Sequence, residues 1–386
     1  MALTLATSIF ALGWKPGWRM WGVAAQEPAW IDLRVITGGV ATVAAGGDPY
    51  RANPHDPAGR TFNYPSLWLR IFPATLSEAG YAWVALSFAG AAAIALLATS
   101  TPLTPRRGIG LAAAAFSPMT LLGVERGNTD LAIFAITVCA LRALGARAHC
   151  WQLLGAGGLA LATVLKLFPA LALLSVIACG DRSTRRLALV ALAASGAWLA
   201  AHASETLLSL ANTQIGAVHS YGRNTLPFWL ELHGNVYGWA VDRERLQQLG
   251  AWAALLAFGW ALWRGARLDR GPLSAVILRA TYLPWLAGTG VFVATFLAGS
   301  SFGYRLWFVL PGLPWWFELA TAPSALRSWA RVALAGLAAM LFASGAWWIP
   351  LTWCSLAAGW VFLIASGVAL GATLPLALRA KRGGAV

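Results

Sequence analysis

Long apolar runs alternate with short polar segments along most of this 386-residue chain. Hydrophobic residues make up 59% of the sequence and charged residues 11%, whereas soluble domains carry roughly 45–50% and 25%. An apolar surplus of this size cannot be buried in one soluble core. The pattern therefore predicts an all-α fold, a polytopic transmembrane helical bundle with about 10–12 membrane helices.

Basic residues orient these apolar runs, because Lys and Arg are enriched in cytoplasmic loops. They cluster in short loops such as TPRRG (104–108) and DRSTRR (181–186). With these loops inside, we expect one multi-pass domain in the cell membrane, with long extracytoplasmic loops at 14–66 and 203–249. Residues 2–13 are apolar but fewer than the roughly 20 that a span needs, so they predict a shortened or truncated first membrane helix.

The segment from Trp151 to Gly180 carries basic flanks on both sides, so it must cross the membrane an even number of times. Its thirty residues are too few for two full spans at about 1.5 Å per residue. We therefore expect two short helices that meet at KLFP (166–169), with Lys166 at the extracytoplasmic tip. Broken helices of this kind are tolerated where they line a protein-walled cavity.

Charge and motif content narrow the function classes. The formal charge of +14 could suggest nucleic-acid binding, but the Arg residues fall in short loops and form no basic stripe with interleaved aromatics. The four cysteines lack CxxC spacing, so neither a disulfide framework nor a zinc site is indicated. No HExxH, GxSxG, P-loop or dinucleotide motif occurs in a suitable context. We expect no cofactor and no bound metal.

Charge, Gly, Pro and aromatic residues concentrate in the stretch from Trp30 to Pro65. Asp32 lies just before Leu33–Ala45, a run that predicts an interfacial helix. Two roles for Asp32 stay open: an N-cap or first-turn acid that complements the helix dipole, or a general base that deprotonates an attacking hydroxyl.

Two other acids in this stretch favour local structure. Asp48 lies in GGDPY and indicates turn chemistry, although a contact with substrate stays open, and Asp56 in HDPAGR is typical of a loop. The stretch ends in the turn Asn63-Tyr64-Pro65, where Tyr64 is a candidate for substrate binding.

Further polar groups are predicted on the same, extracytoplasmic side. Charge at a membrane edge is costly unless it is paired or functional, so an Arg126–Asp130 or Glu125–Arg126 ion pair competes with substrate binding. Lys166 could snorkel to the membrane surface or neutralise a phosphate. The candidates for substrate binding are Glu125, Arg126, Asn128, Asp130, Lys166, His219, Arg223, Asn224 and Arg305.

Several short motifs occur in a recurring order: D-L-x-V from Asp32, then G-G-D-P-Y, F-N-Y-P, R-G-N-x-D and finally L-K-L-F-P. In this order the chain resembles the glycosyltransferase family 87 membrane proteins, mannosyltransferase-like enzymes of the GT-C type. The resemblance covers roughly residues 30–180, and more loosely the later half through HSYGRN and SFGYRLWF.

The resemblance implies a GT-C fold, a polyprenyl-phosphate-linked sugar donor and an extracytoplasmic aspartate that acts as the base, a position matched by Asp32. We therefore expect a hexosyltransferase that passes a sugar, with mannose implied, to a lipid or glycan acceptor. The alternative is a transporter or flippase for a lipid-linked or hydrophobic solute, which would require polar residues along the membrane depth and inverted repeats. An inactive scaffold subunit is a third possibility.

Overall fold

The computed structural model describes residues 1–99, 104–214, 216, 219–269, 273, 280–343 and 349–380. The chain divides into two compact units. Unit 1 comprises Met1–Thr99, Leu121–Leu173 and Ser183–Gln214, and unit 2 comprises Ser100–Thr120, Leu174–Arg182 and Ile215–Val386.

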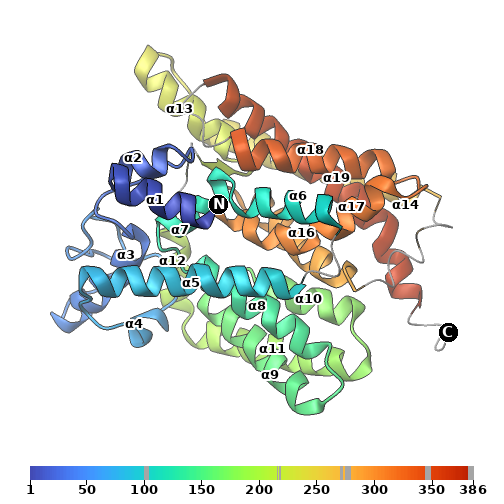
Figure 1. The fold of residues 1–386 in the computed structure, drawn as a ribbon, viewed down its shortest axis with the longest axis horizontal. Coiled ribbons are helices and arrows are strands. Elements are labelled where there is room, and N and C mark those ends of the chain that lie inside the picture. Colours follow the sequence, from blue (N-terminus) through green and yellow to red (C-terminus); the bar gives the residue numbers. More distant parts are fainter. Residues whose placement is uncertain are drawn as a thin grey trace. The chain divides into compact units, whose positions relative to one another are not determined.

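Unit 1 is helical (Figure 1). Its helices are α1 (Ala2–Leu12), α2 (Trp14–Arg19), α3 (Ile31–Ala44), α4 (Trp68–Ile71), α5 (Glu78–Thr99), α8 (Asp130–Leu144), α9 (His149–Leu165), α11 (Arg182–Ala201) and α12 (Ala203–Ala211). Helices α7 (Pro118–Glu125) and α10 (Ala170–Cys179) each run across the boundary between the units.

Helix α8 packs against both α5 and α9. The approach to α9 is close because a Cβ atom at Gly155 would lie 2.6 Å from the Ala140 carbonyl oxygen. Helix α3 reaches α5 through a cluster in which Trp30 and Leu33 pack on Tyr81 and Ala85. The first turn of α3, which contains Asp32, is thereby fixed by apolar packing.

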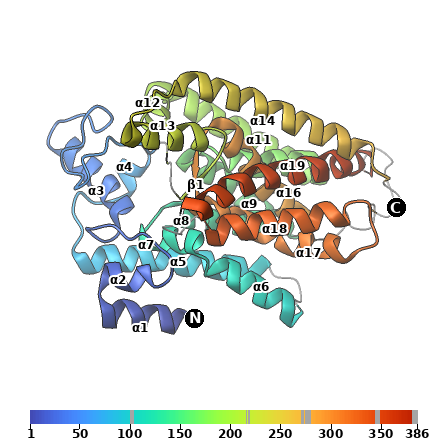
Figure 2. The same cartoon turned by 90° about the horizontal axis from the view of Figure 1, so that it is seen from above.

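Unit 2 contains helices and one small ribbon of strands (Figure 2). Its elements are α6 (Pro105–Ala115), β1 (Ser220–Tyr221), α13 (Thr225–Tyr237), α14 (Arg243–Ala266), α16 (Tyr282–Ala298), β2 (Ser301–Phe302), the 3-10 helix η2 (Gly303–Gly312), α17 (Leu313–Thr321), α18 (Arg327–Ala343) and α19 (Ile349–Ala380). Helix α19 packs against α14 and α18. Strands β1 and β2 pair antiparallel, with Ser220 opposite Phe302 and Tyr221 opposite Ser301.

Among the described residues, two helical segments are long and apolar enough to cross a membrane, Glu78–Thr99 and Leu351–Leu378. Two bent pairs, α6 with α7 at 48° and α11 with α12 at 85°, raise this number to four if each pair is one span. The all-α fold class with membrane-length helices is therefore confirmed. The expected 10–12 spans stay a prediction, because the remaining apolar helices are shorter.

The break predicted at KLFP is present: α9 ends at Leu165 and α10 begins at Ala170. The predicted helix from Leu33 to Ala45 is also present, as α3. The second loop, 203–249, is more ordered than expected, since it holds α12, β1, α13 and the beginning of α14. Helix α14 starts at Arg243, seven residues before the apolar run on which the prediction rested, because Asp242 caps it by accepting a hydrogen bond from the Arg245 backbone N–H. Residues 215, 217 and 218 of this loop lie outside the described part of the chain.

Candidate active site

Asp32 lies in the first turn of α3, and its backbone N–H donates to the Arg126 carbonyl oxygen at 3.1 Å. The N-cap of this helix is Trp30, whose φ of 61° and ψ of 38° place it in the left-handed region. Of the structural roles considered for Asp32, the N-cap is therefore wrong and the first-turn acid is present. A carboxylate in this turn is favoured by the helix dipole.

Both carboxylate oxygens of Asp32 accept hydrogen bonds from distant residues. The Arg60 guanidinium donates Nη1 to Oδ1 at 3.0 Å, and the Asn128 amide donates Nδ2 to Oδ2 at 2.6 Å. The Asp32 side chain remains 11% exposed. Since an ionised carboxylate offers about four lone-pair sites, these two bonds orient the group without exhausting its capacity to accept a proton.

Arg60 joins Asp32 to a second acid, Asp56. Its Nε and Nη2 atoms donate to Asp56 at 3.1 and 3.0 Å, and Nη2 also donates to the Ile31 carbonyl oxygen at 2.6 Å. Burial acts to lower the pKa of Arg60, but the hydrogen bond with Asp56 and the charges of Asp32 and Asp56 outweigh it and raise the pKa. Asp56 lies in a loop as predicted, yet its side chain is fully buried and forms an ion pair.

The ERGNTD turn adds a second ion pair. Arg126 Nε lies 3.1 Å from Glu125 Oε2, which is one of the two pairings considered from the sequence. The Gln26 backbone N–H donates to Glu125 Oε1 at 2.8 Å, and Arg126 Nη1 donates to Gln26 Oε1 at 2.9 Å. The chain before α3 is thus tied to this turn by polar contacts.

Asp130 forms an ion pair with Lys166, whose Nζ atom lies 3.0 Å from Oδ1. The Lys166 ammonium also lies 4.5 Å from the centre of the Tyr64 ring, a cation–π contact. Asn128 connects this pair to Asp32, because its Oδ1 accepts the Asp130 backbone N–H at 2.8 Å while its Nδ2 donates to Asp32. The residue predicted at the helix break therefore belongs to the same polar group as Asp32.

We call this group the Asp32 network. Its members are Gln26, Asp32, Asp56, Arg60, Tyr64, Glu125, Arg126, Asn128, Asp130 and Lys166. Four carboxylates face three cations, so the formal charge of the network is −1 (3 − 4). The network draws on three predicted segments: the first loop, the ERGNTD turn and the KLFP break.

The loop between α3 and α4 is also held by hydrogen bonds that involve its backbone. Asp48 Oδ1 accepts the Tyr50 backbone N–H at 3.0 Å, which is the turn role expected for Asp48, and its predicted contact with substrate stays a prediction. Asn212, at the end of α12, donates Nδ2 to the carbonyl oxygens of Tyr50 and Phe62 at 2.8 and 3.0 Å. Tyr50 donates its hydroxyl to the Tyr64 carbonyl oxygen at 3.0 Å. These bonds fix the loop that carries Arg60 and Tyr64.

The remaining predicted residues lie in unit 2, where Arg223 bonds to backbone atoms. Arg223 donates Nε to the Leu297 carbonyl oxygen at 2.6 Å and Nη1 to that of Gln247 at 3.2 Å. The carbonyl oxygen of His219 accepts the Gly303 N–H at 2.7 Å. The N-cap of α13 is Asn224, whose N–H donates to the Gly299 carbonyl oxygen at 2.9 Å, and Arg305 donates to Ser301 Oγ at 3.1 Å.

Sequence reasoning missed Arg60 and Gln26 and assigned Asp56 only a loop. The four-residue spacing of Asp56 and Arg60 in HDPAGR was an available signal for an ion pair. No local signal marks Gln26. Within the described part of the chain, no group of three His, Cys, Asp or Glu side chains is arranged to hold a metal ion.

No protein-family model matches the chain, and no curated protein matches it. Among solved structures, the chain is similar to the crystal structure of ArnT from Cupriavidus metallidurans in the apo state, with 14% sequence identity and a TM-score of 0.41. The similarity covers 98% of this chain and 76% of that one. A likeness this weak carries no argument about activity. The predicted membership of glycosyltransferase family 87 is not supported by these comparisons.

Proposed function

We propose that this chain is a membrane glycosyltransferase that moves a hexose, such as mannose, from a polyprenyl-phosphate donor to a lipid or glycan acceptor on the extracytoplasmic face. The observation that carries the proposal is the hydrogen bonding of Asp32, whose two oxygens are oriented by Arg60 and Asn128 while the side chain stays partly exposed. The order of sequence motifs that resembles polyprenyl-phosphate-dependent enzymes supplies the choice of donor.

In the proposed reaction, Asp32 takes the proton of the acceptor hydroxyl as that oxygen forms its bond to the anomeric carbon. The bond between the anomeric carbon and the donor phosphate oxygen breaks, and the lipid phosphate leaves with the electron pair. The sugar passes through an oxocarbenium-like transition state that carries positive charge. The negative charge of the Asp32 carboxylate favours that developing charge.

The cations of the network have a complementary role in this proposal. Negative charge grows on the departing phosphate, and cationic side chains stabilise it most where water is excluded. Lys166 and Arg126 of unit 1 are assigned to this task. Arg60 is a positioning residue, since it contacts Asp32 and Asp56.

The test is sugar transfer by the purified chain with a radiolabelled polyprenyl-phosphate sugar. Asp32→Asn keeps the shape of the side chain and removes the base, so we expect a loss of about 10²–10⁴-fold in kcat. The matched control is Glu27→Gln, an acid of the same predicted loop whose ion pair with Lys15 is exposed, and it should retain activity within about threefold.

Retention of most activity by a correctly inserted Asp32→Asn variant would remove Asp32 from the base role. If the purified wild-type chain moves lipid-linked sugar across vesicles without transferring it, the transporter alternative replaces the enzyme.

A further inference from the structure

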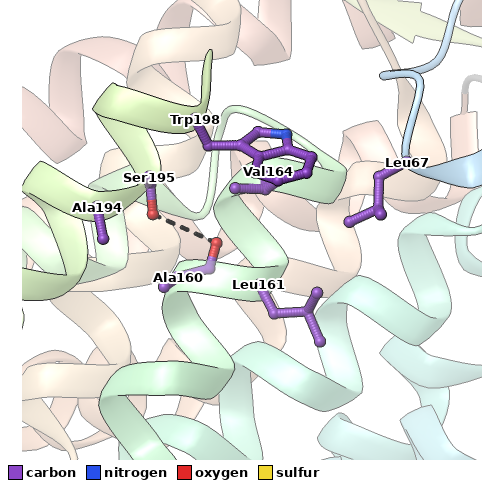
Figure 3. Close-up of a pocket in the computed structure, with 7 residues that line it drawn as sticks. All are labelled: Leu67, Ala160, Leu161, Val164, Ala194, Ser195 and Trp198. Atoms are coloured by element: carbon purple, nitrogen blue, oxygen red, sulfur yellow. Dashed lines mark hydrogen bonds between the residues drawn. The ribbon is translucent and has the colours of Figure 1, made fainter. Parts of the chain in front are cut away.

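Unit 1 contains an open apolar groove with a volume of about 330 Å³, which we call the α9–α11 cavity. Its lining residues are Leu67, Ala160, Leu161, Val164, Ala194, Ser195 and Trp198 (Figure 3). The volume falls in the range of about 300–1,000 Å³ typical of small-molecule sites. Leu161 and Ala194 are exposed, so the cavity reaches the surface of the chain.

The lining of the cavity is almost wholly apolar. Ser195 is the one hydroxyl-bearing residue in the lining, and its Oγ lies 2.8 Å from the Ala191 carbonyl oxygen, to which it donates. It also donates to the Ala160 carbonyl oxygen at 3.3 Å (Figure 3). The Trp198 ring is stacked on His202, with ring centres 4.3 Å apart. The stacked Trp198 ring and the small side chains of Ala160 and Ala194 give an apolar surface that suits a hydrocarbon chain.

Two of the residues that line the α9–α11 cavity are close in sequence to members of the Asp32 network. Val164 precedes Lys166 by two residues, and Leu67 follows Tyr64 by three. Two residues separate Cα atoms by at most about 7.6 Å. The walls are joined at this end, because the Trp68 indole donates to the Leu165 carbonyl oxygen at 3.0 Å. Lys166 and Tyr64 then meet in the cation–π contact.

We infer that the α9–α11 cavity binds the isoprenoid chain of the lipid-phosphate donor, at the segment nearest the phosphate. The inference rests on the proposed function for the identity of the donor. Its own basis is the arrangement of an apolar cavity whose two walls lead to one cation, which matches a molecule with a hydrocarbon chain and an anionic end.

The test uses farnesyl phosphate that carries a photoreactive diazirine on an isoprene unit, without a sugar, added to the full-length chain in vesicles. We expect labelling of the segments 160–164 and 194–198, mapped by mass spectrometry, and its loss on addition of unlabelled polyprenyl phosphate. Because the probe has no sugar, binding is measured separately from transfer. If the chain is labelled at these segments but transfers no sugar, the proposed enzymatic function is overturned and the binding site for the isoprenoid chain is supported.

Matched variants locate the site. Ala194→Leu places a larger side chain in the cavity and should reduce the labelling at least about tenfold, whereas Gly196→Leu on the same helix should leave it within about twofold. A Cβ atom at Gly196 has no other atom within 4 Å. Ala160→Leu with the control Gly157→Leu repeats the comparison on α9, in case one cavity variant fails to fold, since Gly157 is equally unobstructed.

Three outcomes would overturn the inference. The first is labelling outside these segments, and the second is equal loss of labelling in Ala194→Leu and Gly196→Leu. The third is equal competition by phosphatidylglycerol, which would assign the cavity to ordinary bilayer lipid.

Discussion

The polar residues singled out from the sequence behave differently in the two units. In unit 1, Asp32, Asn128 and Lys166 take part in contacts between side chains: Asn128 to Asp32, Lys166 to Asp130 and Lys166 to Tyr64. In unit 2, the Arg223 guanidinium donates to two backbone carbonyl oxygens.

The type of bonding partner distinguishes residues that could take part in a reaction from residues that hold the backbone in place. A charged side chain that bonds to other ionisable side chains gives a site whose charge and geometry can respond to a ligand, whereas a guanidinium that bonds to main-chain carbonyls fixes the backbone. The comparison favours unit 1 as the location of the chemistry and a structural role for Arg223.

The strongest test of the comparison is Arg60→Ala. The substitution leaves Asp32 and fully buried Asp56 without their shared cation, and removal of one partner of a buried pair lowers the free energy of unfolding by about 3–5 kcal/mol. Thermal unfolding of the detergent-purified chain measures this. The control is Arg51→Ala, since its pair with Asp48 is exposed and contributes about 0–1 kcal/mol. Similar losses in both variants would contradict the role of Arg60.

Lys166→Met should have the next largest effect. It removes the ion-pair partner of buried Asp130, so we expect the free energy of unfolding to fall by about 3 kcal/mol. Adding Asp130→Asn should restore much of the stability, because no charged carboxylate is then left at that position. If Lys166 serves the donor phosphate, the KM for donor stays raised in the double variant while the KM for acceptor changes little. A double variant with the wild-type donor KM would end that assignment.

Arg223→Ala tests the structural side of the comparison. The loss of two hydrogen bonds from a charged donor should lower the free energy of unfolding by about 1–3 kcal/mol. The folded fraction should keep its donor KM within about threefold, since the guanidinium is assigned to the backbone. Donor titrations beside thermal unfolding check this. A tenfold or greater rise in donor KM with unchanged stability would move Arg223 into substrate binding and break the comparison.

The smallest effect concerns Tyr50, whose pKa is raised above its ordinary value by burial and by the charges of Glu205 and Asp48. Because the folded pKa exceeds the unfolded one, Tyr50 contributes stability below about pH 10, and this contribution is lost as the pH rises further. Tyr50→Phe should cost about 1 kcal/mol at pH 8, through the lost hydrogen bond to the Tyr64 carbonyl oxygen. The unfolding temperature of this variant should also fall less steeply than that of the wild-type chain between about pH 10 and 11. An unchanged slope would remove Tyr50 from the alkaline transition.

Local features were predictable from the sequence. Basic flanks and the short length of the segment between them indicated the break between α9 and α10, and the apolar run after Asp32 indicated α3. The GGDPY pattern indicated the turn at Asp48. Each of these depends on neighbours within a few residues, where helix and turn propensities act.

Pairings between distant segments were not predictable. Asn128 donates to Asp32 across 96 positions, and nothing in either segment specifies the other. Arg60 was missed because, in a chain with 25 Arg residues, one more Arg in a predicted loop carries little information. The β1–β2 ribbon was missed because two-residue strands show no alternation of polar and apolar positions.

The long sequence separation within the Asp32 network also sets the order of biosynthesis. A ribosome adds about 5–20 residues per second, so Asp32 leaves the peptidyl-transfer centre roughly 5–20 s before Asn128 is made. Lys166 follows later still. During that interval a carboxylate without its partners is costly to bury, so the first turn of α3 cannot reach its final packing until the ERGNTD turn has been made. Closure of unit 1 is therefore a late event of folding, and chains arrested before residue 128 should leave Asp32 accessible to solvent.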